Sequence, residues 1–167
     1  MKDLLQKVLD DILADVPKEK IDERISIFKR NMHNLSYEVM ANPIGVKGIG
    51  KYEVRDSESA FSGYKKGTPV HVKSAINYNS LIDYWYEGKK YGKITNGNKI
   101  KWVYLKENEF GFDTIAYKGY EDPPQVLEMI RNYIDHKKMF EQAMSKKIGM
   151  FYKALKWGGV EDKTTSM

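Results

Sequence analysis

The sequence predicts an α+β domain in which helices pack around a small antiparallel sheet. Apolar residues recur at helical spacing near both ends of the chain and again over residues 71–85. Residues 100–105 and 114–117 are short runs of β-branched and aromatic residues on either side of a glycine-containing turn, which is typical of a β-hairpin. With 167 residues the chain has the length of one domain, and we expect one compact unit over residues 3–157.

Two helices are expected at the N-terminus. The first has apolar residues at helical spacing from Leu4 to Val16, and Pro17 then starts a new segment. The second has an apolar stripe with spacings of four, three, four and three residues, formed by Ile21, Ile25, Phe28, Met32 and Leu35. Because the joint between them is short, the two helices should form an antiparallel pair.

The middle of the chain should combine loops, one helix and the hairpin. Residues 41–70 are rich in Gly, Pro, Ser and Lys, which indicates a loop with short extended pieces such as Tyr52–Arg55. Helical spacing resumes over residues 71–85, and residues 86–99 form a basic turn region. The turn of the hairpin is centred on Asn108–Gly111.

Two more helices are expected over residues 125–137 and 138–156, followed by a disordered tail at 158–167. The apolar face of the last helix comprises Phe140, Met144, Ile148, Phe151 and Leu155. Its opposite face comprises Lys138, Gln142, Lys146, Gly149 and Lys153. Such a basic face is usually just solvated, but because Gly149 allows close approach it could equally lie along phosphates.

Several classes of protein are disfavoured by composition. The chain has no cysteine, so a disulfide framework and a thiolate zinc site are excluded, and its three histidines lack the spacing of metal ligands. No apolar run has the length of a membrane span, and the N-terminus is too acidic for a signal peptide and has no small-residue cleavage site. We therefore expect a soluble intracellular protein without a structural metal.

The positive charge is concentrated in the middle of the chain. The net charge is +5, and residues 41–103 hold eleven basic and five acidic side chains. The same segment contains half of the twelve tyrosines, together with Trp85 and Trp102. Lysines that neutralise phosphates, interleaved with aromatic rings, are typical of a nucleic-acid-binding surface. Because tyrosine-rich segments are also common in half-buried sheets, composition alone leaves both interpretations open.

Residues 45–51, GVKGIGK, have the spacing of a nucleotide-binding P-loop. Tyr52 stands where that loop needs a Ser or Thr for the magnesium ion, Pro43 precedes it, and the residues that follow lack a helical apolar period. We therefore reject an NTPase. A flexible loop with Lys47 and Lys51 remains, whose glycines allow a close approach to the phosphates of a polynucleotide.

Four stretches, in order along the chain, point to a family. They are IGKYEV at 49–54, HVKSAINYN at 71–79, KENEFGFDTIAY at 106–117 and YIDHKKMFEQAMSKKIGMF at 133–151. From Leu4 to Leu155 the chain resembles the C-terminal thumb domain of family B DNA polymerases of T-even-type tailed bacteriophages. No single stretch is decisive, but four in register make coincidence an inadequate explanation.

The resemblance implies a non-catalytic grip on DNA. The thumb of these polymerases holds the primer–template duplex through its sugar–phosphate backbone, and phosphate contacts carry no sequence information. Lys51, Lys73 and Lys146 match basic positions of the family. The full set of expected DNA contacts comprises Lys47, Lys51, Lys73, Tyr78, Lys106, Lys138, Lys146 and Lys147.

The chain also departs from the family. Gln142 and Asp113 stand where related enzymes tend to have lysine, which puts these two contacts in doubt. The tail, EDKTTSM, lacks the apolar and aromatic residues that dock on a sliding clamp, so clamp binding through the tail is not predicted. The palm carboxylates that hold two metal ions are missing, as are residues resembling the exonuclease site, so no catalytic residue, cofactor or metal is expected on this chain.

The resemblance therefore implies a partner. Magnesium ions and nucleotidyl transfer would belong to a larger polymerase chain that carries palm, fingers and exonuclease, in the cytoplasm of a phage-infected host. Because the chain opens at Met1 where a thumb would begin, we expect a separately encoded subunit of a split polymerase, with an excised domain as the alternative. Two other classes of protein stay open. One is a stand-alone basic nucleic-acid-binding protein, and the other is an interaction module whose basic segment binds a protein partner.

Overall fold

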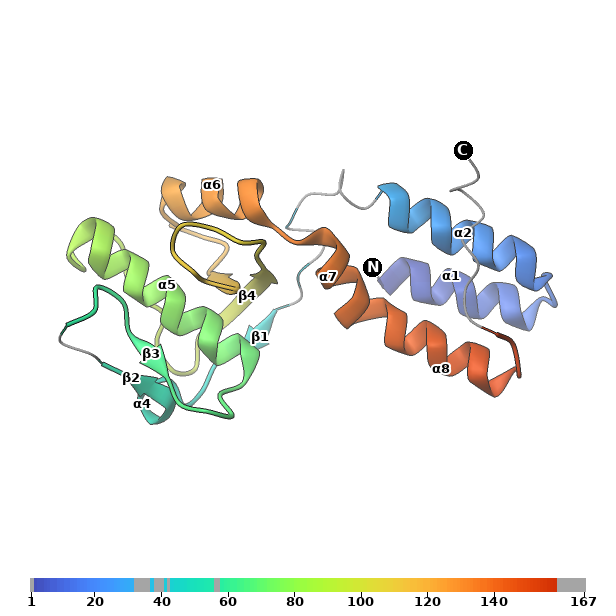
Figure 1. The fold of residues 1–167 in the computed structure, drawn as a ribbon, viewed down its shortest axis with the longest axis horizontal. Helices are drawn as coiled ribbons and strands as arrows, with labels where there is room; N and C mark the ends of the chain where they lie inside the picture. Colours follow the sequence, from blue (N-terminus) through green and yellow to red (C-terminus); the bar gives the residue numbers. More distant parts are fainter. Residues whose placement is uncertain (1, 32–36, 38–40, 42, 56–57, 159–167) are drawn as a thin grey trace. The chain divides into compact units, whose positions relative to one another are not determined.

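The computed structural model describes residues 2–31, 37, 41, 43–55 and 58–158. It confirms the α+β class, with a small antiparallel sheet among helices (Figure 1). The contacts divide the chain into two compact units, where one had been expected. The first unit joins Met1–Met40 to His136–Met167, and the second is Ala41–Asp135.

The first unit is helical. Its N-terminal part consists of α1 (Lys2–Leu13) and α2 (Lys18–Asn31), which lie side by side as predicted (Figure 1). Asp11 of α1 and Arg24 of α2 form an ion pair across the two helices, with 2.8 Å between Nε and Oδ2. The predicted apolar positions Met32 and Leu35 lie outside the described residues.

The C-terminal part of the first unit is a helical run with a π-helical segment inside it. It comprises α7 (His136–Phe140), η2 (Glu141–Ser145) and α8 (Lys146–Ala154). Phe140, Met144 and Ile148 are buried, as the sequence predicts. The prediction for the end of this face was wrong: Leu155 is 38% exposed, and Tyr152 takes the buried position with 2% exposure.

Tyr152 is buried because α2 offers its hydroxyl a partner. The hydroxyl donates a hydrogen bond to Oδ1 of Asp22 over 2.5 Å, and Lys18 Nζ lies 2.7 Å from Oδ2 of the same carboxylate. Asp22 is 1% exposed, so both of its oxygens are satisfied within the protein. Burial, and next the bond to Asp22, raises the pKa of Tyr152 well above its usual range.

The second unit contains the sheet. Its strands are β1 (Ile44–Gly45), β4 (Lys99–Tyr104) and β5 (Thr114–Tyr117), in the order β1-β4-β5. The predicted hairpin is confirmed, because Tyr104 pairs with Thr114 in antiparallel register and the backbone N–H of Gly111 donates to the carbonyl of Asn108. A separate two-stranded sheet pairs β2 (Glu53–Val54) with β3 (Gly63–Tyr64), next to the one-turn helix α4 (Ile49–Tyr52).

Two helices complete the second unit. The central helix α5 (Val70–Tyr86) packs on β4 and β5 and matches the helix predicted over 71–85. The other, α6 (Pro124–Tyr133), ends four residues before the predicted Lys137. It ends there because Ile134 leaves the helical region, with a ψ of 129°, and forms an antiparallel bridge with Leu105. None of the described helices is long and apolar enough to cross a membrane.

Candidate nucleic-acid interface

In the loop at residues 45–51, several of the backbone donors that a P-loop would aim at phosphates are used within the protein. Val46 N–H donates to the carbonyl of Asn98, and Ile49 N–H donates to the side-chain oxygen of Asn96. The N–H groups of Lys51 and Tyr52 both donate to the carbonyl of Gly48. A P-loop aims such donors at phosphates, so the rejection of an NTPase on sequence grounds is supported by the geometry.

Gly48 allows the loop to turn. Its φ of 84° lies in the left-handed region, and a Cβ at this position would lie only 3.3 Å from the ring of Tyr52. One turn of helix, α4, follows, although the sequence had predicted none there. This turn ends at Lys51 and Tyr52, and both residues therefore project from a short, fixed element.

Lysines and tyrosines of α4, β3 and α5 lie together on the second unit. Lys51 Nζ lies 5.1 Å from the centroid of the Tyr52 ring, and Lys73 Nζ lies 5.3 Å from that of Tyr64. The backbone joins the two pairs, since Lys65 N–H donates to the Tyr52 carbonyl over 2.9 Å. We call this group, comprising Lys51, Tyr52, Tyr64, Lys65, Lys66 and Lys73, the basic patch.

The lysines of the basic patch reach the surface, and within the described residues none of them is paired with a carboxylate. Lys51, Lys65 and Lys66 are exposed and Lys73 is half-buried. Among the described residues, no carboxylate forms an ion pair with any of these four lysines, whereas Lys89 and Lys93, near the other end of α5, pair with Glu87 and Asp83. The patch is therefore available for an external anion. The exposed Lys47 precedes α4 by two residues.

The polar residues of the HVKSAINYN segment have a structural role. Within α5, Asn77 donates to the carbonyl of Thr114, while the side chain of Asn79 both donates to and accepts from the backbone of Ile94. Ser80, which directly follows this segment, accepts a hydrogen bond from the N–H of Ser62. All three side chains are buried, so α5 holds the surrounding loops in place and thereby positions Lys73 and the rest of the basic patch.

Tyr78 lies in the core and offers no surface to DNA. It is fully buried, and its hydroxyl donates to Asp122 over 2.9 Å. Burial, and next the carboxylate of Asp122, raises the pKa of Tyr78 well above its usual range. The prediction that Tyr78 contacts DNA therefore does not suit this structure.

His71, at the start of α5, has its pKa lowered by burial, which favours the neutral imidazole.

The other predicted contacts lie elsewhere. Lys106 is exposed after β4, where its N–H donates to the carbonyl of Tyr133. Lys138 is half-buried in α7, Lys147 is exposed in α8, and Lys146 begins α8. These three belong to the first unit, so the structure brings together Lys51 and Lys73 but does not gather the whole predicted set in one unit.

Sequence reasoning missed Lys65, Lys66, Tyr52 and Tyr64 as members of the site. Their signal is the segment YKKG at 64–67, whose two adjacent lysines follow an aromatic residue. That signal was weak because the pairing of β2 with β3, which places Tyr64 opposite Glu53, is not apparent from so short a strand.

The part of the chain that the structure describes contains no group of three acidic or histidine side chains arranged to hold a metal ion.

No protein-family model matches the chain, and no curated protein sequence matches it.

Proposed function

We propose that this chain is the thumb part of a phage replicative DNA polymerase and grips the product duplex for a palm-bearing partner chain. The observation that carries the proposal is the basic patch, in which four lysines without a described carboxylate partner lie beside two tyrosine rings. Lysines of this kind release counterions from duplex DNA when they contact phosphates, without reading sequence. Retention of the duplex would slow its release and raise processivity.

The resemblance to the phage thumb domain supports a polymerase context. Two of the stretches that carry it, IGKYEV and HVKSAINYN, contribute Lys51, Tyr52 and Lys73 to the patch. Nucleotidyl transfer and its magnesium ions are assigned to the partner chain, in the cytoplasm of the infected host. A stand-alone nucleic-acid-binding protein would use the same patch, so the two functions must be separated by experiment.

Duplex binding tests the patch itself. A triple variant, Lys51→Ala, Lys65→Ala and Lys73→Ala, should bind duplex DNA of any sequence more weakly than the wild-type chain. If each lysine meets one phosphate, the slope of log K against log salt should become shallower by about 0.9 per lysine, or roughly 2.7 in total. The measurement is a fluorescence-anisotropy titration of labelled duplexes at several salt concentrations.

Lys89→Ala is the matched control, since Lys89 is also an exposed lysine of the second unit. It follows the C-terminal end of α5, while Lys73 lies near the start of this 17-residue helix, which spans about 25 Å. Its loss should leave the salt slope unchanged. Equal effects of the control and the triple variant, or a wild-type affinity that does not respond to salt, would overturn the patch as a DNA contact.

Primer extension separates the thumb from a stand-alone protein. The tagged chain would be used to isolate partners from infected cells, and extension would be measured with and without the chain added back. A large partner that makes longer products with the wild-type chain than with the triple variant supports the thumb. If the chain binds duplex DNA but primer extension is the same with and without it, the stand-alone protein is supported instead.

A further inference from the structure

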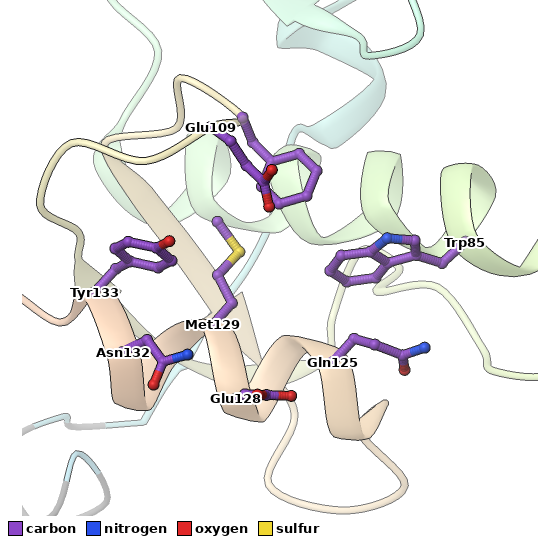
Figure 2. Close-up of a pocket in the computed structure, with 8 residues that line it drawn as sticks. Trp85, Glu109, Gln125, Glu128, Met129, Asn132 and Tyr133 are labelled. Atoms are coloured by element: carbon purple, nitrogen blue, oxygen red, sulfur yellow. The ribbon is translucent and has the colours of Figure 1, made fainter.

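An open pocket of about 220 Å³ lies in the second unit, and none of its lining residues belongs to the basic patch (Figure 2). It is formed by the end of α5, the turn between β4 and β5, and one face of α6. Figure 2 shows Trp85 and Tyr133 on opposite sides, with Met129 between them. Met129 is only 4% exposed and contributes an apolar side chain to the lining. Phe110 adds a third aromatic ring to the lining.

The aromatic wall is held in place by the hairpin turn. Asn108 accepts a hydrogen bond from the N–H of Phe110 over 3.1 Å and donates to the carbonyl of Phe112 over 2.7 Å. The rings of Phe110 and Trp85 meet edge to face, with 5.6 Å between centroids. These contacts fix Phe110 against Trp85, so the aromatic wall of the pocket is preformed.

Two carboxylates line the same pocket. Glu109 comes from the hairpin turn and Glu128 from α6, and both are exposed. Within the described residues, neither forms an ion pair with a basic side chain. Gln125 and Asn132 add amide groups, and the Gln125 oxygen accepts a hydrogen bond from the Tyr86 hydroxyl. The lining thus joins negative charge to aromatic rings.

From this combination we infer that the pocket binds an alkylguanidinium group, the head group of arginine. A guanidinium is planar, stacks on aromatic rings and donates to carboxylates, and it loses less hydration than an ammonium when it does so. The volume is below the ~300–1,000 Å³ of pockets for drug-sized ligands, which suits a single head group. The two carboxylates would repel the phosphates of DNA, so the pocket is not expected to contact DNA. The inference is therefore independent of the proposed function.

Other ligand classes fit the lining less well. A hard metal ion takes six or more oxygen ligands, and here two carboxylates share the pocket with three rings and a thioether. A purely apolar ligand would leave both carboxylates without a partner. An arginine side chain presented by a protein and a small free guanidinium share the required chemistry, so the experiment must distinguish these two sources.

The test is a titration of the ¹⁵N-labelled full chain, monitored by NMR. The probes are the capped peptide Gly-Arg-Gly, the same peptide with citrulline, which is nearly the same shape but uncharged, and ethylguanidinium. Gly-Arg-Gly should shift the indole N–H of Trp85 and the amides of residues 109–110 and 128–133, whereas the citrulline peptide should not. Assignment of the indole signal uses Trp85→Phe.

Two variants and one control complete the test. Glu109→Gln and Glu128→Gln should each weaken Gly-Arg-Gly binding by about two- to fivefold, while Glu107→Gln, an exposed glutamate of the same turn outside the pocket, should not change it. Equal shifts with citrulline, equal loss in the Glu107 variant, or no shift at saturating peptide would overturn the inference. Tighter binding of the peptide than of ethylguanidinium indicates a protein source, and equal binding indicates a small molecule.

Discussion

Asn79 shows how a single buried side chain holds the loop that leads to Lys51 of the basic patch. It is 8% exposed, and its amide bonds both the N–H and the carbonyl of Ile94, over 2.7 and 2.9 Å. Residue 94 leads directly into the turn at residues 95–98, which bonds to the loop at Val46 and Ile49. Asn79 is therefore linked through two sets of hydrogen bonds to the loop that ends at Lys51.

Replacing Asn79 by alanine should lower the free energy of unfolding by about 2–4 kcal/mol, since two buried backbone groups lose their partner. Asn98→Ala is the control, because its bonds to Thr95 are solvent-exposed, and its cost should stay below about 1 kcal/mol. Urea denaturation gives both values. Similar values for the two variants would show that the bonds of Asn79 add little.

Tyr78 makes stability depend on pH in the alkaline range. Its pKa in the folded chain lies far above the ordinary value of about 10 that it has when unfolded. Above pH 10 the unfolded state loses the phenolic proton while the folded state keeps it, so stability falls as pH rises. Below pH 10 both states are protonated, and this contribution is fully present.

Tyr78→Phe should therefore make the loss of stability above pH 10 less steep, by up to about 1.4 kcal/mol per pH unit. The measurement is the free energy of unfolding in urea between pH 8 and pH 11. At pH 8 the variant should be less stable by about 1 kcal/mol because the bond to Asp122 is lost. Parallel pH curves for the two proteins would contradict this explanation.

At the scale of elements, the first unit depends on a polar contact between helices far apart in sequence. Tyr152 of α8 and Lys18 of α2 both bond Asp22 of α2. Because Asp22 is buried, a missing partner leaves an acceptor that water does not reach.

Tyr152→Phe should destabilise the first unit by about 1–3 kcal/mol, which can be followed by hydrogen exchange of the α2 and α8 amides. Tyr120→Phe removes a hydroxyl from a tyrosine that is 60% exposed and serves as the control, with an expected change within ~0.5 kcal/mol. An unchanged exchange rate in the Tyr152 variant would show that apolar packing alone holds these helices.

At the scale of the whole molecule, the division into two units has a testable consequence. The second unit has its own core, which includes Ile76, Ile100, Ile115 and Ile130, each at most 1% exposed. Its sheet, α5 and α6 all lie within residues 41–135. The first unit, by contrast, is assembled from both ends of the chain.

A fragment of residues 41–135 should therefore fold by itself and unfold cooperatively, as seen by circular dichroism and a dispersed NMR spectrum. It should also keep salt-dependent duplex binding, because the basic patch lies inside it. The fragment of residues 1–40 alone should stay largely unfolded, since its helices lose α8. An unfolded 41–135 fragment would contradict the independence of the second unit.

The sequence by itself determined the periodic elements of this protein. Both N-terminal helices, α5 and the hairpin around Asn108–Gly111 were predicted because apolar spacing and turn chemistry are local signals. Lys51 and Lys73 were named from the sequence as expected DNA contacts, and the structure places each of them beside a tyrosine ring of the basic patch.

Only the tertiary structure decided the rest, because it depends on pairings between distant residues. The end of α6 follows from the bridge between Ile134 and Leu105, and the burial of Tyr152 follows from its bond to Asp22, 130 residues earlier. Tyr78 looked available as an aromatic ligand for DNA until its hydroxyl was seen to meet Asp122 in the core. The spacing of residues along the sequence predicts which of them share one face of an element. The residues that pack against that face are determined by the tertiary structure.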